Sequence, residues 1–124
     1  MKPNILVIDD NELRNFLGES LREFGYHVDI ADGVPNAMPL MKTRNYHVII
    51  TDKNMPGMNG SKDGGFDIAG YSKEYLPNTK VIIITGDRMA EIDRRILDLG
   101  IADIVFKPFQ MSTLKEKIDK LIRY

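Results

Sequence analysis

An uninterrupted run of β-branched residues near the middle of the chain most constrains the fold. The run consists of Val48, Ile49, Ile50 and Thr51, and Asp52 follows it directly. Such a run, without polar alternation, indicates a strand buried on both faces, which is typical of the middle of a parallel sheet. Asp52 therefore stands at the carboxyl end of a central strand. Open α/β sheets bind their ligands at that edge, so we expect this carboxylate to be functional.

The rest of the chain alternates between strand and helix patterns. Beside the strand at 47–51, strands are expected at residues 4–8, 26–31, 80–84 and 103–106. Apolar residues at helical spacing follow each strand, over residues 11–24, 34–44, 66–75, 89–99 and 111–121. Five strands alternating with five helices predict an α/β doubly wound (βα)5 domain with a parallel five-stranded sheet. We choose the flavodoxin-like strand order 2-1-3-4-5.

Prolines and glycines weaken two of the expected helices. Pro39 removes an interior hydrogen bond from the helix over 34–44, which we expect to be short, late-starting or kinked. Glycines crowd the region after the central strand, so a loop is expected through about Gly65, before a weak helix from about Phe66. The fourth helix is predicted by a helical stripe of four apolar residues that Gly100 closes: Met89, Ile92, Ile96 and Leu99.

Composition excludes several classes of site and partner. The 124 residues, 43% hydrophobic and 28% charged, suit one domain over residues 1–124. The chain has no cysteine, which excludes thiol catalysis, zinc ribbons and disulfides. No apolar run approaches the roughly 20 residues of a membrane span, and a strand begins too early for a signal peptide, so we expect a cytoplasmic protein. A net charge of −1 gives no electrostatic case for binding nucleic acid or an anionic membrane.

Chemically active side chains follow four of the expected strands. Asp9 and Asp10 follow the first strand, Thr85 ends the fourth and Lys107 follows the fifth. In the chosen order, Asp9 and Asp10 lie beside Asp52, and three converging carboxylates repel one another unless a cation binds. Oxygen ligands without histidine or thiolate favour Mg²⁺. Together with the Lys107 ammonium and the Thr85 hydroxyl, the three carboxylates form a site suited to phosphoryl transfer. In that reaction Asp52 attacks phosphorus and becomes an aspartyl phosphate.

Each of these residues also has a purely structural interpretation. Asp9 and Asp10 could cap a helix N-terminus, and Asp52 could cap a turn. Thr85, which precedes a glycine, is by itself more often part of a strand-ending turn, and a lone Lys107 is more often solvated. Their coincidence at one sheet edge favours the phosphoryl-transfer site.

Four short motifs carry a resemblance over essentially the whole chain. They are Asp9-Asp10, Asp52-Lys53-Asn54-Met55-Pro56-Gly57, Ile84-Thr85-Gly86 and Lys107-Pro108-Phe109. In this order they resemble a response-regulator receiver domain of bacterial two-component signalling. The resemblance implies that Asp52 accepts a phosphoryl group from a sensor histidine kinase or a histidine phosphotransfer protein. It also implies that Mg²⁺ is held by Asp10, Asp52 and the backbone carbonyl of Asn54, with Asp9 acting through a water.

The resemblance also implies roles for the residues at the ends of the fourth and fifth strands, and this chain departs from the family pattern at one position. Lys107, preceding a cis bond to Pro108, would pair with the phosphoryl oxygens, and Thr85 would swing in to hydrogen-bond them. The family usually has an aromatic residue three positions before the lysine, where this chain has Ile104. Threonine–aromatic switching in its usual form is therefore in question. We expect Phe106 to point to the other face of the strand, where it is no substitute.

These observations predict a binding and switching module, not an enzyme with multiple turnover, that catalyses its own phosphorylation and slow hydrolysis. Lys53 and Asp87 should place charges at the rim of the site, and Arg94 and Arg95 should be solvated. Two alternatives stay open: a small Mg²⁺-dependent phosphatase with Asp52 as covalent intermediate, and a flavodoxin-like interaction module with a degenerate site. The sequence leaves open which kinase acts on the chain, and whether it stands alone or belongs to a longer protein with an output domain.

Overall fold

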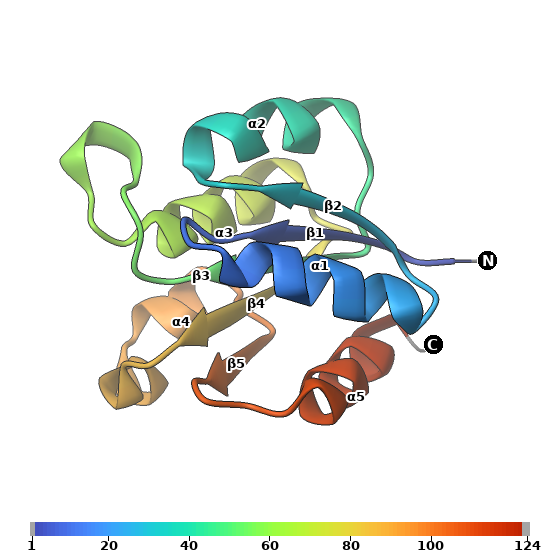
Figure 1. The fold of residues 1–124 in the computed structure, drawn as a ribbon. Coiled ribbons are helices and arrows are strands. Elements are labelled where there is room, and N and C mark those ends of the chain that lie inside the picture. Colours follow the sequence, from blue (N-terminus) through green and yellow to red (C-terminus); the bar gives the residue numbers. More distant parts are fainter. Residues whose placement is uncertain (1, 123–124) are drawn as a thin grey trace.

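The computed structural model describes residues 2–122, and its five strands form one parallel sheet (Figure 1). The strands are β1 (Asn4–Ile8), β2 (His27–Ala31), β3 (Val48–Asp52), β4 (Lys80–Thr85) and β5 (Asp103–Phe106). They lie in the order β2-β1-β3-β4-β5, and each neighbouring pair is parallel. The predicted doubly wound fold and strand order are therefore confirmed.

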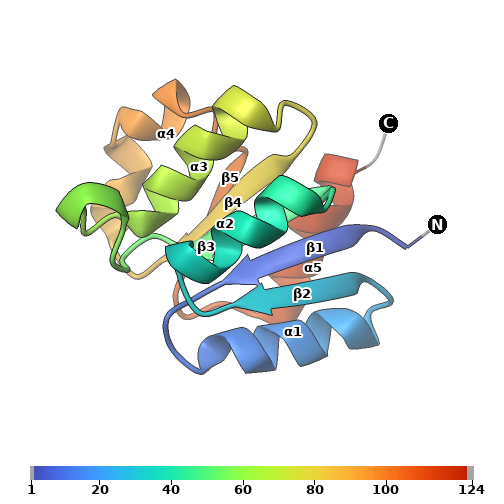
Figure 2. The ribbon, with the colours of Figure 1, turned by 90° about the horizontal axis from the view of Figure 1, so that it is seen from above.

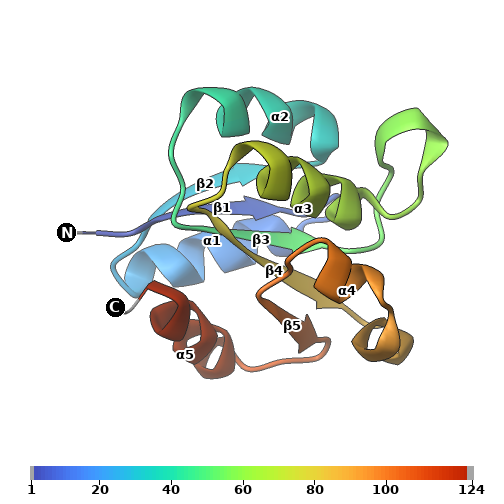
Figure 3. The same cartoon turned by 180° about the vertical axis from the view of Figure 1, so that it is seen from behind.

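Helices cover both faces of this sheet. The α-helices are α1 (Leu13–Glu23), α2 (Val34–Thr43), α3 (Gly64–Tyr75), α4 (Arg95–Asp98) and α5 (Met111–Ile122), and the 3-10 helices are η1 (Met58–Gly60) and η2 (Arg88–Ile92). Helices α1 and α5 cover one face, whereas α2, α3 and α4 cover the other (Figures 2 and 3). No helix within residues 2–122 is both long and apolar enough to cross a membrane.

Strand alternation divides the core into two layers. Along β1, Leu6 and Ile8 join the layer beneath α2 and α3, whereas Ile5 and Val7 join the layer beneath α1 and α5. Strand β3 is buried along its whole length, as the unbroken apolar run predicts. Asp52 therefore lies at the end of a strand that is fully packed within the core.

Helix α3 ends at Tyr75 and begins at Gly64, two residues before the predicted start at about Phe66. A Cβ atom at Gly65 would lie 2.4 Å from the carbonyl oxygen of Asp52 and 2.8 Å from the Cα atom of Lys53. The Gly65 N–H donates to the Lys53 carbonyl oxygen at 3.2 Å. Glycine is present because the helix starts directly against the backbone at the end of β3.

Helix α2 begins at Val34 and continues through Pro39, so the expected late start is also wrong. A proline inside a helix deprives the carbonyl four residues earlier, here that of Pro35, of its N–H partner. Both prolines are exposed, so water can replace the missing bond. Packing of Val34, Ala37 and Met41 into the core then holds the helix together.

The single helix predicted over 89–99 is interrupted at Asp93, between η2 and α4. The Asp93 carboxylate accepts a hydrogen bond from the Arg95 backbone N–H at 3.0 Å, which competes with helical bonding. Met89 and Ile92 are 64% and 72% exposed, so the first half of the apolar stripe buries little surface. Only its second half, Ile96 and Leu99, packs against the core.

Candidate functional site

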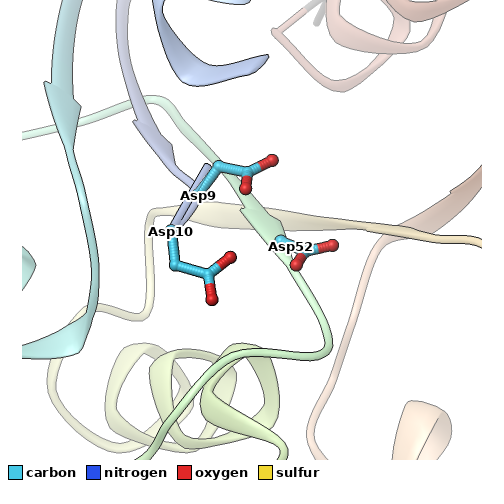
Figure 4. Close-up of side chains that lie close together, drawn as sticks. All are labelled: Asp9, Asp10 and Asp52. Atoms are coloured by element: carbon cyan, nitrogen blue, oxygen red, sulfur yellow. The ribbon is translucent and has the colours of Figure 1, made fainter. Parts of the chain in front are cut away.

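Three carboxylates lie together at the carboxyl ends of β1 and β3 (Figure 4). Ile8 is paired with Thr51 in the sheet, so Asp9 and Asp10 follow β1 beside Asp52. One carboxylate oxygen from each aspartate lies within 4.8 Å of the others. Asp9 and Asp52 are only 1% and 6% exposed, whereas Asp10 is exposed. The site is thus walled by two buried carboxylates and opens to solvent at the third.

Burial sets the protonation behaviour of the two inner carboxylates. It raises the pKa of Asp9, an effect that the hydrogen bond from the Asn11 N–H at 3.0 Å opposes and the charge of Asp52 reinforces. Burial also raises the pKa of Asp52, although the Lys107 ammonium counteracts it. Both shifts mean that the ionised cluster costs free energy in the folded protein. A divalent cation would relieve that cost, and an all-oxygen ligand set with one exposed member fits Mg²⁺, which keeps several waters.

Lys107 supplies the positive charge nearest to the cluster. It follows β5, and its backbone N–H donates to the Thr85 carbonyl oxygen at 2.9 Å, which fixes it beside β4. Its Nζ donates to Asp52 Oδ1 at 3.1 Å. The lysine is therefore ion-paired, not simply solvated, and the bond to Pro108 is cis, as the resemblance implies.

Thr85 is completely buried at the end of β4, and its hydroxyl has two partners. The hydroxyl donates to Asn54 Oδ1 at 3.2 Å and accepts a hydrogen bond from the Asp87 N–H at 3.0 Å. The Asn54 side chain thus links the segment after β3 to the end of β4. The metal-binding role of the Asn54 carbonyl and the contact of Thr85 with a phosphoryl group stay predictions.

Lys53 is buried and 5% exposed, so its expected position at the rim is wrong. The Asp52 carboxylate lies within 4.8 Å of those of Asp9 and Asp10. The Lys53 side chain, next along the chain, lies on the other face, with its ammonium 5.3 Å from the ring centroid of Phe66 in α3. The Lys53 ammonium pairs with Asp63 at 3.2 Å and with Asp87 at 3.6 Å. Alternation along the strand could have placed this lysine on the α3 side. Its partners lie too far along the chain for sequence spacing to reveal them.

Arg95 also departs from its expected role as a solvated charge. It pairs with Asp63 at 3.0 Å and with Asp93 at 2.7 Å, although its side chain is 50% exposed. Its guanidinium lies 4.5 Å from the Phe66 ring centroid. Lys53, Asp63 and Arg95 therefore join the end of β3 to α4 by charge contacts that the sequence analysis missed.

Ile104 and Phe106 lie on the same face of β5, so the expectation that Phe106 faces the other way is wrong. Alternate residues of a strand share a face. Both line an open depression of about 1010 Å³ between η2, α4, β5 and α5, whereas Val105 packs in the layer beneath α1 and α5. The Arg88 guanidinium lies 4.6 Å from the Phe106 ring centroid. An aromatic ring is thus present on this face, two residues from Ile104.

Comparisons with known proteins agree on one family. Residues 5–119 match the family model described as the response regulator receiver domain. The chemotaxis protein CheY-3 of Vibrio cholerae is 32% identical over 121 residues, which cover 94% of this chain and 89% of that protein. The transcriptional regulatory protein CusR of Escherichia coli is 29% identical, and the alignment covers 96% of this chain but 50% of that protein.

A solved structure gives the same result. The response regulator protein TrrA from Thermotoga maritima, crystallised in complex with Mg²⁺-BeF, is 32% identical and superposes with a TM-score of 0.85. The superposition covers 98% of this chain and 100% of that one. On the family match, the relatives and the fold together, this chain belongs to the response regulator receiver domain family of two-component signalling.

Proposed function

We propose that the chain is a phosphorylation-dependent switch in which Asp52 is the phosphoacceptor. One observation carries the proposal: Asp9, Asp10 and Asp52 converge within 4.8 Å, with the Lys107 ammonium 3.1 Å from Asp52. A buried carboxylate between acidic ligands and an ammonium suits nucleophilic attack on phosphorus. The proposed phosphodonor is a histidine kinase or a histidine phosphotransfer protein, and the proposed location is the cytoplasm.

In the proposed reaction, a carboxylate oxygen of Asp52 attacks phosphorus of a phosphohistidine. A bond from oxygen to phosphorus forms while the bond from phosphorus to nitrogen breaks, and the imidazole nitrogen leaves with the electron pair and takes up a proton. Lys107 moves its contact from the carboxylate to a phosphoryl oxygen, where it neutralises charge. Asp9, Asp10, Asp52 and the Asn54 carbonyl would hold Mg²⁺, which supplies further neutralisation of the phosphoryl oxygens when bound.

The test is intact mass after incubation with acetyl phosphate, with and without Mg²⁺. We expect the wild-type protein to gain one phosphoryl group only with Mg²⁺, and Asp52→Asn to gain none. Asp32→Asn is a matched control, because it makes the same substitution at an exposed aspartate directly after β2. It should gain the phosphoryl group like the wild type.

Two results would contradict the proposal. If folded wild-type protein gains no phosphoryl group under any condition, a phosphorylation-independent interaction module is favoured. If the protein instead hydrolyses small phosphate esters with multiple turnover, and Asp52→Asn abolishes this, it is a phosphatase. The proposal itself is of a switching module that acts on an output domain or partner protein, without multiple turnover.

A further inference from the structure

Lys53 is a buried cation that immediately follows the proposed phosphoacceptor. An unpaired ammonium at 5% exposure would be strongly unfavourable. Two carboxylates from different parts of the chain pair with it: Asp63, just before α3, and Asp87, just after β4. Lys53 therefore holds the segment after β4 against the start of α3.

This charge cluster extends to α4. The second oxygen of Asp63 accepts a hydrogen bond from Arg95, and the Phe66 ring contacts both cations, at 5.3 Å from Lys53 Nζ and 4.5 Å from Arg95 Cζ. The segment from 86 to 99, which contains η2 and α4, is thus attached at both ends to the same buried centre. Ala90, Ile96 and Leu99 of this segment pack against the core, whereas Met89, Ile92 and Leu97 are 64%, 72% and 84% exposed. The ion pairs therefore add to the apolar contacts that attach this segment, and they are the contacts that reach Lys53 and Asp63.

Asp87 connects this cluster to the phosphorylation site. Its backbone N–H donates to the Thr85 hydroxyl at 3.0 Å, while its carboxylate faces Lys53 at 3.6 Å. To donate to a phosphoryl group on Asp52, the Thr85 hydroxyl must give up its bond to Asn54, because it has a single proton, whereas it can keep accepting from the Asp87 N–H. A movement of Thr85 therefore pulls on the Asp87–Lys53 pair.

We propose that Lys53, Asp63, Asp87 and Arg95 form an ionic latch that holds the 86–99 segment in its unphosphorylated arrangement. Lys53 is a positioning residue that acts on Thr85 through Asp87, and phosphorylation releases the latch. This inference rests on the proposed phosphorylation of Asp52. Coupling between two sites is reciprocal, so a latch that resists phosphorylation-induced movement also opposes phosphorylation.

The test combines amide hydrogen exchange over residues 86–99 with intact-mass measurement of phosphoryl gain from acetyl phosphate and Mg²⁺. Asp87→Asn removes the charge that faces Lys53 but keeps the Oδ1 that accepts from the Met89 N–H at 3.0 Å. Lys53→Met keeps an apolar stem of similar length against Phe66. The control is Glu91→Gln, which removes one negative charge from an exposed side chain of the same segment.

Without phosphodonor, exchange over 86–99 should rise about fivefold or more in Asp87→Asn and Lys53→Met. Phosphoryl gain in both variants should be faster than in the wild type. Asp87→Asn removes a negative charge and Lys53→Met removes a positive charge. Electrostatic attraction of the negatively charged phosphodonor would therefore not accelerate phosphoryl gain in both variants. The double variant should add little, and Glu91→Gln should match the wild type. In the wild type, phosphorylation itself should raise exchange over 86–99.

Normal phosphoryl gain with unchanged exchange in both single variants would overturn the latch and leave the proposed function intact. Wild-type phosphorylation that leaves exchange over 86–99 unchanged would do the same. Absence of phosphoryl gain in every protein, wild type included, would overturn the proposed function and the latch with it.

Discussion

At the scale of single residues, the buried carboxylate of Asp9 lowers the stability of the folded protein when it is ionised. Its carboxylate is 1% exposed, and burial raises its pKa above the ordinary value of 3.8. The folded state therefore binds this proton more tightly than the unfolded state, and stability falls as the pH rises through the folded pKa. At neutral pH without metal, the charged Asp9 is a cost to the fold.

Asp9→Asn should therefore stabilise the metal-free protein. The amide keeps the Oδ1 that accepts from the Asn11 N–H but removes the buried charge. In EDTA at pH 7 we expect an increase in Tm of about 4 °C, corresponding to about 1 kcal/mol at this chain length. Differential scanning calorimetry measures the shift, and Asp98→Asn, at an exposed aspartate, should show none. A lower Tm for Asp9→Asn would contradict the cost assigned to the buried charge.

The sequence predicted which side chains meet at the carboxyl edge of the sheet better than it predicted the position of Lys53. Asp9, Asp10, Asp52 and Lys107 were placed together because parallel strands bring their carboxyl ends to one edge. The position of Lys53 was wrong, because its burial depends on a distant helix start and on carboxylates 10 and 34 residues away. Ion pairs of that kind follow from the packed fold, not from local spacing.

At the scale of elements, the glycines after β3 have different roles. Gly65 lies where α3 meets the backbone of Asp52 and Lys53, whereas a Cβ at Gly70 of the same helix would lie 3.6 Å from a Leu99 methyl group, an ordinary contact. By helix propensity alone, all of these glycines are helix-weakening residues. The difference depends on which surface each one faces.

Gly65→Ala and Gly70→Ala should change stability in opposite directions. Alanine at 65 would overlap the Asp52 carbonyl and should lower the free energy of unfolding by about 1–3 kcal/mol. Alanine at 70 fits and should raise it by up to about 1 kcal/mol through helix propensity. Urea unfolding measures both. A stable Gly65→Ala variant would show that α3 can move away from β3.

The interruption at Asp93 has a related cause. The apolar stripe from Met89 to Leu99 has the helical period, but only its second half meets a surface that it can cover. Period alone predicts a helix, whereas burial decides whether one is stable. The sequence could not show that the sheet edge leaves Met89 and Ile92 without a partner.

At the scale of the whole molecule, the acidic edge should make stability depend on the metal. Mg²⁺ that binds the folded state alone stabilises it by about 2.7 kcal/mol at a concentration 100 times its Kd. We expect Mg²⁺ to raise the Tm of the wild type, and the rise to shrink in Asp9→Asn and Asp52→Asn. Thermal unfolding over a series of Mg²⁺ concentrations measures this, with K⁺ at matched ionic strength as the control. Equal shifts with both cations would point to general screening.

The close approach of α3 to β3 also has a mechanical consequence. Where Gly65 closely approaches the Asp52 carbonyl, the start of α3 lies directly behind the proposed phosphoacceptor and leaves no room for a side chain between them. Across the site, the 86–99 segment is held partly by ion pairs, and Met89, Ile92 and Leu97 lie exposed on it. We therefore expect the 86–99 side of the crevice to move more readily than the α3 side when Asp52 is modified. The direction of that movement then depends on the close packing of α3 against β3 as much as on the 86–99 segment itself.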